Sequence, residues 1–263
     1  MPETDPLLIE RDGGVLTLSN NDAPINRMTF EYMDALEAAL DEAANDPAVR
    51  ALVITAEGDR NFSVGMDLKQ LPAGAAARGG PEAVFDQRLR VLARIESMDK
   101  PSIATLFGYC LGGGLELPLA CHFRLAAAEG GRIGLPELDL GSVPAWGGTA
   151  RLTRCVGRDS ALDMILRAKK ISGPEALRIG LVQEVHPLDE LKAAAHALAQ
   201  ELAAMPPIAV AGVLRCVVGA AGAPLDEALA TERAAVKSCA GTRDQAEGMR
   251  AFMEKRRPVF TGE

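Results

Sequence analysis

The chain has 263 residues, of which 48% are hydrophobic and 24% charged, a composition typical of a globular protein with a substantial core. The formal net charge of −8 argues against nucleic acid or an anionic membrane surface as the main partner. Five scattered cysteines without a C-x-x-C pair argue against a disulfide framework, and only three histidines argue against a multi-histidine metal site.

The first residues, MPETDPLLIERDGG, carry acidic residues where a signal peptide has lysines, and they contain no apolar segment of the signal-peptide kind. No apolar run reaches the roughly 20 residues that a membrane-spanning helix needs. We therefore expect a reduced, soluble, cytoplasmic protein.

The N-terminal part predicts a strand, a helix and a second strand. GVLTLS, residues 14–19, is a short strand-like run. Residues 29–46 carry apolar side chains at helical spacing, with Thr29 as the expected N-cap and Pro47 just past the end. VRALVITA, residues 49–56, is a continuous apolar run typical of a buried strand. This order predicts an α/β fold with right-handed crossovers.

The middle of the chain continues the alternation. Residues 73–81, AGAAARGGP, have almost no side chains to pack, so we expect a mobile loop there that is a candidate substrate lid. The patterns predict helices over 81–99, 147–157, 159–168 and 173–180, and strands over 101–108, 123–129 and 131–138.

From about Asp189 the pattern is helical almost to the end, with breaks at MPP (205–207) and GAAGAP (219–224). We therefore expect an α/β core containing the active site over residues 1–200. Residues 201–263 are expected to form a helical C-terminal region.

Four stretches carry residues suited to chemistry: NFSVGMDL (61–68), GGGLE (112–116), LPELDLG (135–141) and PAWGGTARL (144–152). The first two follow predicted strands and contain glycines, which let a ligand approach unpaired backbone N–H groups. Two such junctions can direct two N–H donors at one oxygen atom, which is the arrangement of an oxyanion hole. Each stretch alone has an ordinary structural explanation. Their combination is far more specific.

These stretches resemble the enoyl-CoA hydratase/isomerase (crotonase) family over essentially the whole chain. The resemblance rests on blocks at 61–71, 108–126, 135–152, 171–185 and 248–260. It implies a crotonase-like spiral of ββα turns with a helical C-terminal extension for oligomerisation and CoA contact. It also implies an acyl-CoA substrate, assembly as a homotrimer or homohexamer, and no metal or redox cofactor, since the substrate itself carries coenzyme A.

The resemblance assigns roles to individual residues. The backbone N–H groups of Met66 and Gly113 would form the oxyanion hole for the thioester carbonyl. Glu116 and Glu137 match the two catalytic glutamates of family hydratases, with Glu137 as the expected proton donor and Glu116 as the residue that activates water. The sequence leaves this division of roles open. Without the resemblance, Glu116 is equally explained as a helix N-terminal acid, and Glu137 as an exposed loop carboxylate.

Other positions matched by the resemblance concern substrate binding. Phe252 and Lys255 match positions that help to hold the CoA of a neighbouring subunit, although Lys255 is equally explained as a solvated helix end. Trp146 and its neighbour Ala145 are candidate acyl-pocket residues. Trp146 stands where family hydratases mostly have a small residue, and it is similar to the WGGT stretch of members that decarboxylate short branched acyl-CoAs.

Two further departures from the family pattern are Pro118, where alanine is usual, and His122, where aspartate is usual. Pro118 lacks an N–H and is expected to disturb the first turn of its helix. The hypothesis is therefore hydration of a 2-enoyl-CoA, with decarboxylation or isomerisation of an acyl-CoA as the alternative. A family member that binds CoA esters without turnover is the non-enzymatic alternative.

Overall fold

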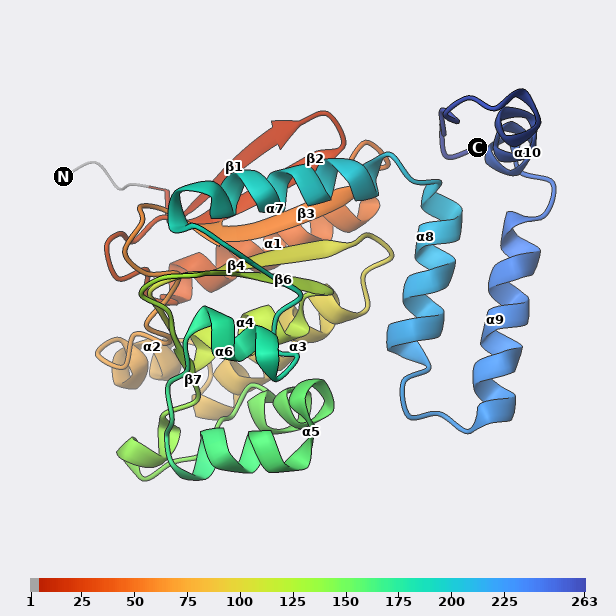
Figure 1. Ribbon diagram of the computed structural model, residues 1–263. Coiled ribbons are helices and arrows are strands. Elements are labelled where there is room, and N and C mark those ends of the chain that lie inside the picture. The colour runs from red at the N-terminus through yellow and green to blue at the C-terminus, as the bar shows by residue number, and fades with distance from the viewer. Residues whose placement is uncertain (1–4) are drawn as a thin grey trace.

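The computed structural model describes residues 5–263, which build one six-stranded sheet and a smaller two-stranded sheet (Figure 1). The large sheet has the order β1-β2-β3-β4-β6-β8, and the small sheet pairs β5 with β7. The strands are β1 (Leu7–Asp12), β2 (Val15–Asn20), β3 (Ala51–Ala56), β4 (Ser102–Leu106), β5 (Tyr109–Leu111), β6 (Phe123–Ala127), β7 (Arg132–Gly134) and β8 (Glu184–His186). Strands β1 and β2 are antiparallel, and all other pairs are parallel.

Ten α-helices connect or cover these strands within the described residues. They are α1 (Phe30–Asn45), α2 (Leu71–Ala77), α3 (Pro81–Glu96), α4 (Gly113–Ala120), α5 (Gly148–Leu166), α6 (Gly173–Arg178), α7 (Leu188–Ala203), α8 (Pro207–Leu214), α9 (Leu225–Cys239) and α10 (Arg243–Glu254). A short 3₁₀ helix spans Glu137–Leu140, and a π-helical turn spans Arg215–Gly219.

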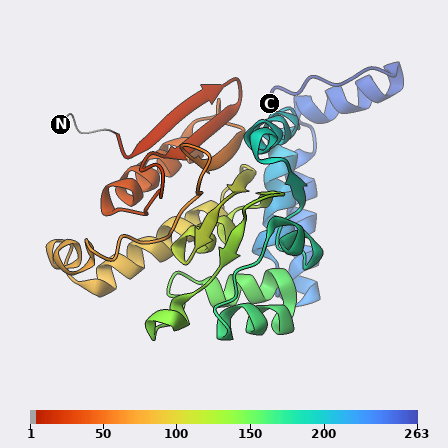
Figure 2. The same cartoon turned by 60° about the vertical axis from the view of Figure 1, so that its left-hand side comes forward.

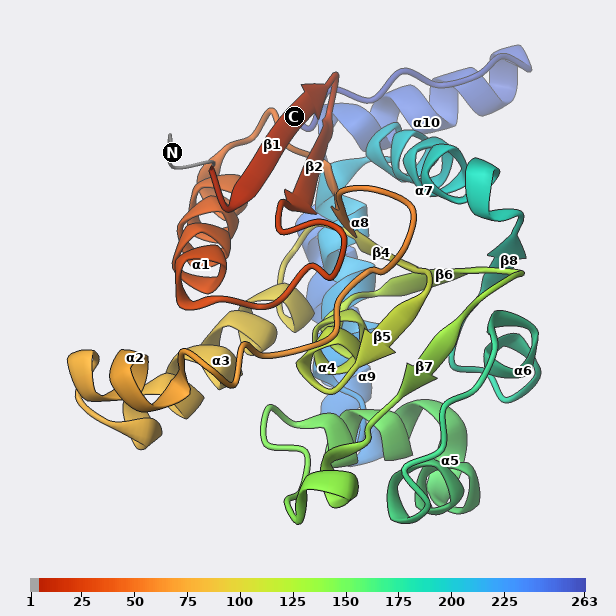
Figure 3. The same cartoon turned by 90° about the vertical axis from the view of Figure 1, so that its left-hand side faces the viewer.

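Two successive β-β-α units place the loops of the candidate site on one side of the molecule. Strand β4 is followed by β5 and α4, and β6 is followed by β7, the 3₁₀ helix and α5. Because β4 pairs with β6 and β5 pairs with β7, the second unit lies directly beside the first (Figure 3). The loop after β5 and the loop after β7 therefore reach the same place.

The N-terminal predictions are confirmed in detail. Helix α1 begins directly after Thr29, whose Oγ1 accepts a hydrogen bond from the Tyr32 N–H at 3.1 Å. Every residue of β3 is buried, as the continuous apolar run of residues 51–56 predicts for a central parallel strand. The edge strand β1 was not predicted, because its residues 9–12 are exposed and three of these four are charged.

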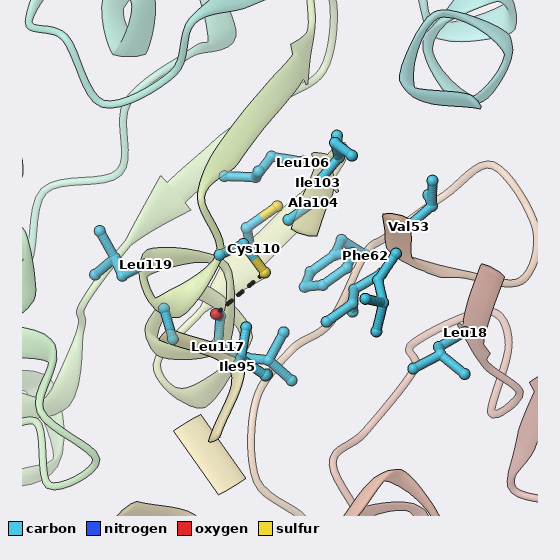
Figure 4. Close-up of a cluster of buried hydrophobic side chains, with 14 of the residues drawn as sticks. Leu18, Val53, Phe62, Ile95, Ile103, Ala104, Leu106, Cys110, Leu117 and Leu119 are labelled. Atoms are coloured by element: carbon cyan, nitrogen blue, oxygen red, sulfur yellow. Dashed lines mark hydrogen bonds between the residues drawn. The ribbon is translucent and has the colours of Figure 1, made fainter. Parts of the chain in front are cut away.

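The hydrophobic core lies between the large sheet and the helices around it. Figure 4 shows part of this core, where side chains from β2, β3, β4 and α4 meet those of α3. Helix α7 covers one face of the sheet and packs on β3, β4 and β6 (Figure 1). This core holds β4, β5 and α4 in place, and these elements carry the glycine triplet.

The prediction of a loop over 73–81 is wrong for its first half. Residues Leu71–Ala77 form α2, and only the turn through Gly79 and Gly80 remains irregular, with positive φ at both glycines. Alanine, which recurs in this segment, has the highest helix propensity of any residue type, and Pro72 suits a first helical turn. Gly74 also packs on Phe30, since a Cβ at that position would lie 2.0 Å from Cε2 of the ring.

The C-terminal helices lie where the pattern predicts them. Figure 1 shows α8 and α9 side by side next to the core, with α10 beyond them at the C-terminal end. In Figure 2, α10 again projects away from the sheet. Within the described residues no single helix is both long and apolar enough to cross a membrane. One bent pair passes that test, by length and composition only: Leu188–Ala203 with Pro207–Gly219, at an angle of 109°.

Candidate active site

The loop after β3 presents the Met66 amide without a hydrogen-bond acceptor. The Met28 N–H donates to the Gly65 carbonyl at 2.8 Å, and the Asp67 N–H donates to the Met28 carbonyl at 3.4 Å. These two bonds hold one edge of the loop, so the Met66 N–H points from the opposite edge. Among residues 5–263 no acceptor pairs with it.

The Gly113 amide is the second free donor. Gly113 is the first residue of α4, where a helix leaves its backbone N–H groups without intrahelical partners. The preceding Gly112 adopts φ +56° to turn the chain from β5 into the helix. Gly65 approaches this turn closely, because a Cβ on it would lie 3.5 Å from the Gly113 nitrogen. The two free amides therefore come together from separate parts of the chain.

Each glycine of the triplet meets a different neighbour. A Cβ on Gly112 would lie 3.1 Å from Glu137 Oε1, and a Cβ on Gly113 would lie 2.3 Å from Cζ3 of Trp146. A Cβ on Gly114 would lie 2.5 Å from the Ser63 carbonyl oxygen. Gly113 and Gly114 therefore exclude a side chain for reasons of space, whereas at Gly112 the positive φ of +56° is the main constraint.

Glu116 is buried in the first turn of α4, and its carboxylate is held by a second loop. Its Oε1 accepts hydrogen bonds from the Trp146 N–H at 2.8 Å and from the Gly148 N–H at 2.9 Å. Burial nevertheless raises the pKa of Glu116 to about 7, with the nearby Glu137 carboxylate contributing in the same direction. No described residue donates a hydrogen bond to Oε2, so this oxygen is available to a ligand.

Glu137 opens the 3₁₀ helix after β7 and brings its carboxyl group against Gly112. Its Oε2 is buried and has no hydrogen-bond partner among the described residues. Burial raises the pKa of Glu137. The two carboxyl groups thus meet at the glycine triplet in a desolvated environment that favours their neutral forms.

The raised pKa of Glu116 makes a prediction about stability. An unfolded chain releases this proton near pH 4.5, whereas the folded chain keeps it up to about pH 7. Because the folded state binds more protons in this interval, the free energy of unfolding should fall as the pH rises from 4.5 to 7. Over this interval the free energy of unfolding should fall by about 3 kcal/mol in total. Denaturant titrations at pH 5 and pH 8 should show this loss in the wild type and a much smaller one in Glu116→Gln. Equal losses in both proteins would contradict the assignment.

The Trp146 ring covers Gly113. The Trp146 side chain is buried with its ring edge against Gly113. Ala145, the residue before it, is exposed. The Arg151 guanidinium donates to the Trp146 carbonyl at 2.9 Å and pairs with Glu96 at 2.8 Å, which anchors the loop to α3.

Phe252 and Lys255 lie on or just after α10, far from α4 within one chain (Figure 1). Phe252 is 78% exposed, and Lys255 ends the helix with φ +55°. Neither contributes to the cluster of Met66, Gly113, Glu116 and Glu137.

The two other departures from the family pattern lie in the second half of α4 and just after it. Pro118 lies inside α4, which ends two residues later at Ala120. His122 Nδ1 accepts a hydrogen bond from the Ser102 N–H at 3.0 Å, joining the end of α4 to the start of β4. Burial lowers the pKa of His122.

The sequence interpretation missed Arg88. It lies on α3 in the same stripe as Val84, Val91 and Ile95, and it is fully buried. A charged residue at a core position of a helical repeat was the available signal. No group of three or more His, Cys, Asp or Glu side chains within residues 5–263 is arranged to hold a metal ion.

Comparison with known proteins identifies the class. Residues 10–263 match the family model described as "Enoyl-CoA hydratase/isomerase", and the chain belongs to this family. It is 37% identical to a "Probable enoyl-CoA hydratase" of Bacillus subtilis over 98% of both chains. It is 33% identical to a "Short-chain-enoyl-CoA hydratase" of Clostridium acetobutylicum over 97% of both chains.

The fold comparison agrees with the sequence comparison. An enoyl-CoA hydratase crystal structure from Geobacillus kaustophilus superposes with a TM-score of 0.93 at 31% identity, covering 99% of this chain and 98% of the other. The predicted crotonase fold with C-terminal helices is confirmed.

Proposed function

We propose that this protein is an enoyl-CoA hydratase that adds water to the C2=C3 bond of a 2-enoyl-CoA thioester. The observation that carries the proposal is the meeting of two desolvated carboxyl groups with two unpaired backbone amides at the glycine triplet. Membership of the family and the names of the two curated relatives support the same reaction class.

The reaction needs one general base, one general acid and a stabilised enolate. A carboxylate removes a proton from water as the water oxygen bonds to C3 of the substrate. The C2=C3 electron pair then moves toward the thioester, and negative charge develops on its carbonyl oxygen. The Met66 and Gly113 N–H groups would stabilise this charge. A carboxylic acid then delivers a proton to C2, which completes the addition of one water molecule.

Glu116 suits the base and Glu137 the acid. Two backbone N–H donors fix Glu116 Oε1 and leave Oε2 free for a water molecule, and a pKa of about 7 suits a group that takes a proton from that water and releases it again. Glu137 Oε2 has no donor among the described residues and is buried, which favours the protonated form that can give up a proton. After each turnover, proton exchange with solvent would restore the starting forms.

Trp146 supports a second candidate function, decarboxylation or isomerisation of a short acyl-CoA. Its ring fills space against Gly113, which restricts the acyl groups that fit beside the oxyanion hole. Decarboxylation would use the same enolate stabilisation but would release CO₂ from a malonyl-type thioester. The non-enzymatic candidate is binding of CoA esters without turnover.

Assays with crotonyl-CoA and with malonyl-type thioesters distinguish these candidate functions. Hydration predicts loss of the conjugated-enone absorbance and formation of 3-hydroxybutyryl-CoA. Release of CO₂ from malonyl-type thioesters, without loss of the enone band of crotonyl-CoA, would instead identify a decarboxylase. Tight binding of CoA esters without either reaction would identify the non-enzymatic function.

The C-terminal region supports a proposal about assembly. Apolar side chains of α8 to α10 lie on the surface of the single chain, among them Val213, Val217, Leu229, Val236 and Phe252, each more than half exposed. Such a surface is typical of a subunit interface. Together with the family membership, it supports a homotrimer or homohexamer in which Phe252 and Lys255 contact the CoA bound by a neighbouring subunit.

A further inference from the structure

The buried Arg88 guanidinium is the strongest unexplained feature of the molecule. Its Nη1 donates to Gln87 Oε1, but Nε and Nη2 are buried without an acceptor among the described residues. The other buried arginine, Arg124, donates instead to the Leu181 carbonyl at 2.7 Å and to the Cys121 carbonyl at 2.6 Å. A buried charge without its hydrogen bonds is strongly unfavourable, so a ligand that accepts from Nε and Nη2 would stabilise Arg88.

Nε and Nη2 of Arg88, the two nitrogens without an acceptor, lie on one edge of the guanidinium, and arginines commonly bind carboxylates through this edge. Elsewhere in this chain, Nε and Nη2 together bind one carboxylate in the pairs Arg27–Asp22 and Arg178–Glu175. Arg88 offers the same pair of donors, and no ion pair of the described residues includes it. A carboxylate fits this edge with two parallel hydrogen bonds.

Arg88 lies next to the acyl side of the candidate site. Its Cζ is 5.6 Å from the centroid of the Trp146 ring, and the same ring packs on Gly113 of the oxyanion hole. On the other side Cζ is 5.2 Å from the Phe30 ring, which belongs to the cluster against which Met66 packs. The two rings stabilise the faces of the cation but cannot accept its in-plane N–H groups.

Charged groups around Arg88 leave it positive. Burial lowers its pKa to about 10, which is still well above neutral pH. Asp34, Glu37 and Glu31 favour the charge from α1, and Arg78 disfavours it. Asp34 is already engaged by Arg78 at 2.7 Å and by Gln87 at 2.7 Å. The nearest acids therefore serve other donors.

We propose that Arg88 binds a carboxylate at the far end of the acyl chain, so that the preferred substrate is the mono-CoA thioester of a short unsaturated dicarboxylic acid. This inference rests on the proposed hydratase function and adds the substrate class. The thioester end would lie on Met66 and Gly113, the acyl chain would run along the Trp146 ring toward Arg88, and its terminal carboxylate would take the Nε and Nη2 hydrogen bonds.

The test compares crotonyl-CoA with the mono-CoA thioesters of glutaconic acid and 2-hexenedioic acid. Because all three carry the same CoA, the ratio of their kcat/KM values isolates the acyl tail. We expect the wild type to prefer a dicarboxylic thioester, and Arg88→Met to lower that ratio by about 100-fold, the scale of breaking a buried charge pair. Arg88→Lys keeps the charge without the paired geometry and should give an intermediate ratio.

The control is Arg90→Met on the same helix. Arg90 is exposed and pairs with Glu37 at 2.6 Å, so its loss should leave the ratio unchanged. Thermal unfolding of each variant shows whether it is folded. Titration calorimetry with glutaryl-CoA and butyryl-CoA measures the same preference without turnover, and we expect Arg88→Met to abolish it.

The outcomes separate this inference from the proposed function. Hydration of all three thioesters with equal ratios in the wild type and Arg88→Met overturns the inference and leaves the hydratase function standing. If none of the three thioesters is hydrated, the proposed hydratase function is overturned. In that case a preference for glutaryl-CoA that disappears in Arg88→Met still supports the carboxylate site, and equal affinities overturn it.

Discussion

Replacing Glu137 by Gln is expected to slow the hydration of crotonyl-CoA by about 10²–10⁴, the range typical of losing a general acid or base. The amide fills the same space against Gly112 but cannot supply the proton for C2. Glu116→Gln should cause a loss on the same scale, because its amide can still accept from the Trp146 and Gly148 N–H groups but cannot take a proton from water. Initial rates at saturating crotonyl-CoA measure both effects.

The control for this pair is Asp139→Asn. Asp139 lies on the same 3₁₀ helix as Glu137 but is exposed and pairs with Lys170 at 3.3 Å. Its rate should stay close to that of the wild type, since exposed ion pairs contribute little. Wild-type turnover in both glutamine variants would disprove the two-glutamate mechanism.

The second large effect is expected from Gly113→Ala. The new Cβ would overlap the Trp146 ring at 2.3 Å, so either the ring or the Gly113 amide must shift. Loss of one oxyanion donor typically lowers kcat by about 10²–10³, and we expect a fall of this size. Gly219→Ala is the matched control, because no atom lies within 4 Å of its added Cβ and its φ is not left-handed.

A double variant distinguishes displacement of the amide from general disruption. Combining Gly113→Ala with Trp146→Ala removes the clashing ring, and the measured kcat should recover by at least about tenfold over Gly113→Ala alone. Such non-additivity is expected for two residues in contact. If the two losses simply add, the contact between Gly113 and Trp146 does not position the amide.

Much of the fold was predictable because local signals and tertiary demands agree. Thr29 caps α1, the apolar run at 51–56 forms a buried strand, and the breaks before α8 and α9 fall at prolines and glycines. The segment 73–81 was misjudged because small residues were taken as an absence of packing. In the structure the missing side chain of Gly74 is what lets α2 lie against Phe30.

The candidate site was predictable only in part. The resemblance to the crotonase family indicated Glu116, Glu137, Met66 and Gly113, and the fold brings these four residues together from three separate parts of the chain. The contacts between side chains that lie far apart in the sequence could not be predicted in the same way. The hydrogen bond from the Trp146 N–H to Glu116 and the position of Arg88 beside the Trp146 ring depend on how α3 and the 144–148 loop meet. The pattern of α3 alone cannot indicate which helix or loop its buried face contacts.

Trp146 has a further consequence for experiments. It is the only tryptophan in the chain, it is 3% exposed, and its ring touches Gly113 while the Arg88 cation lies 5.6 Å from its centroid. Intrinsic tryptophan fluorescence therefore originates from a single indole beside Gly113. Any thioester that enters the site changes the surroundings of that indole directly. The protein thus carries its own optical reporter of acyl-group binding, with no label and no turnover required.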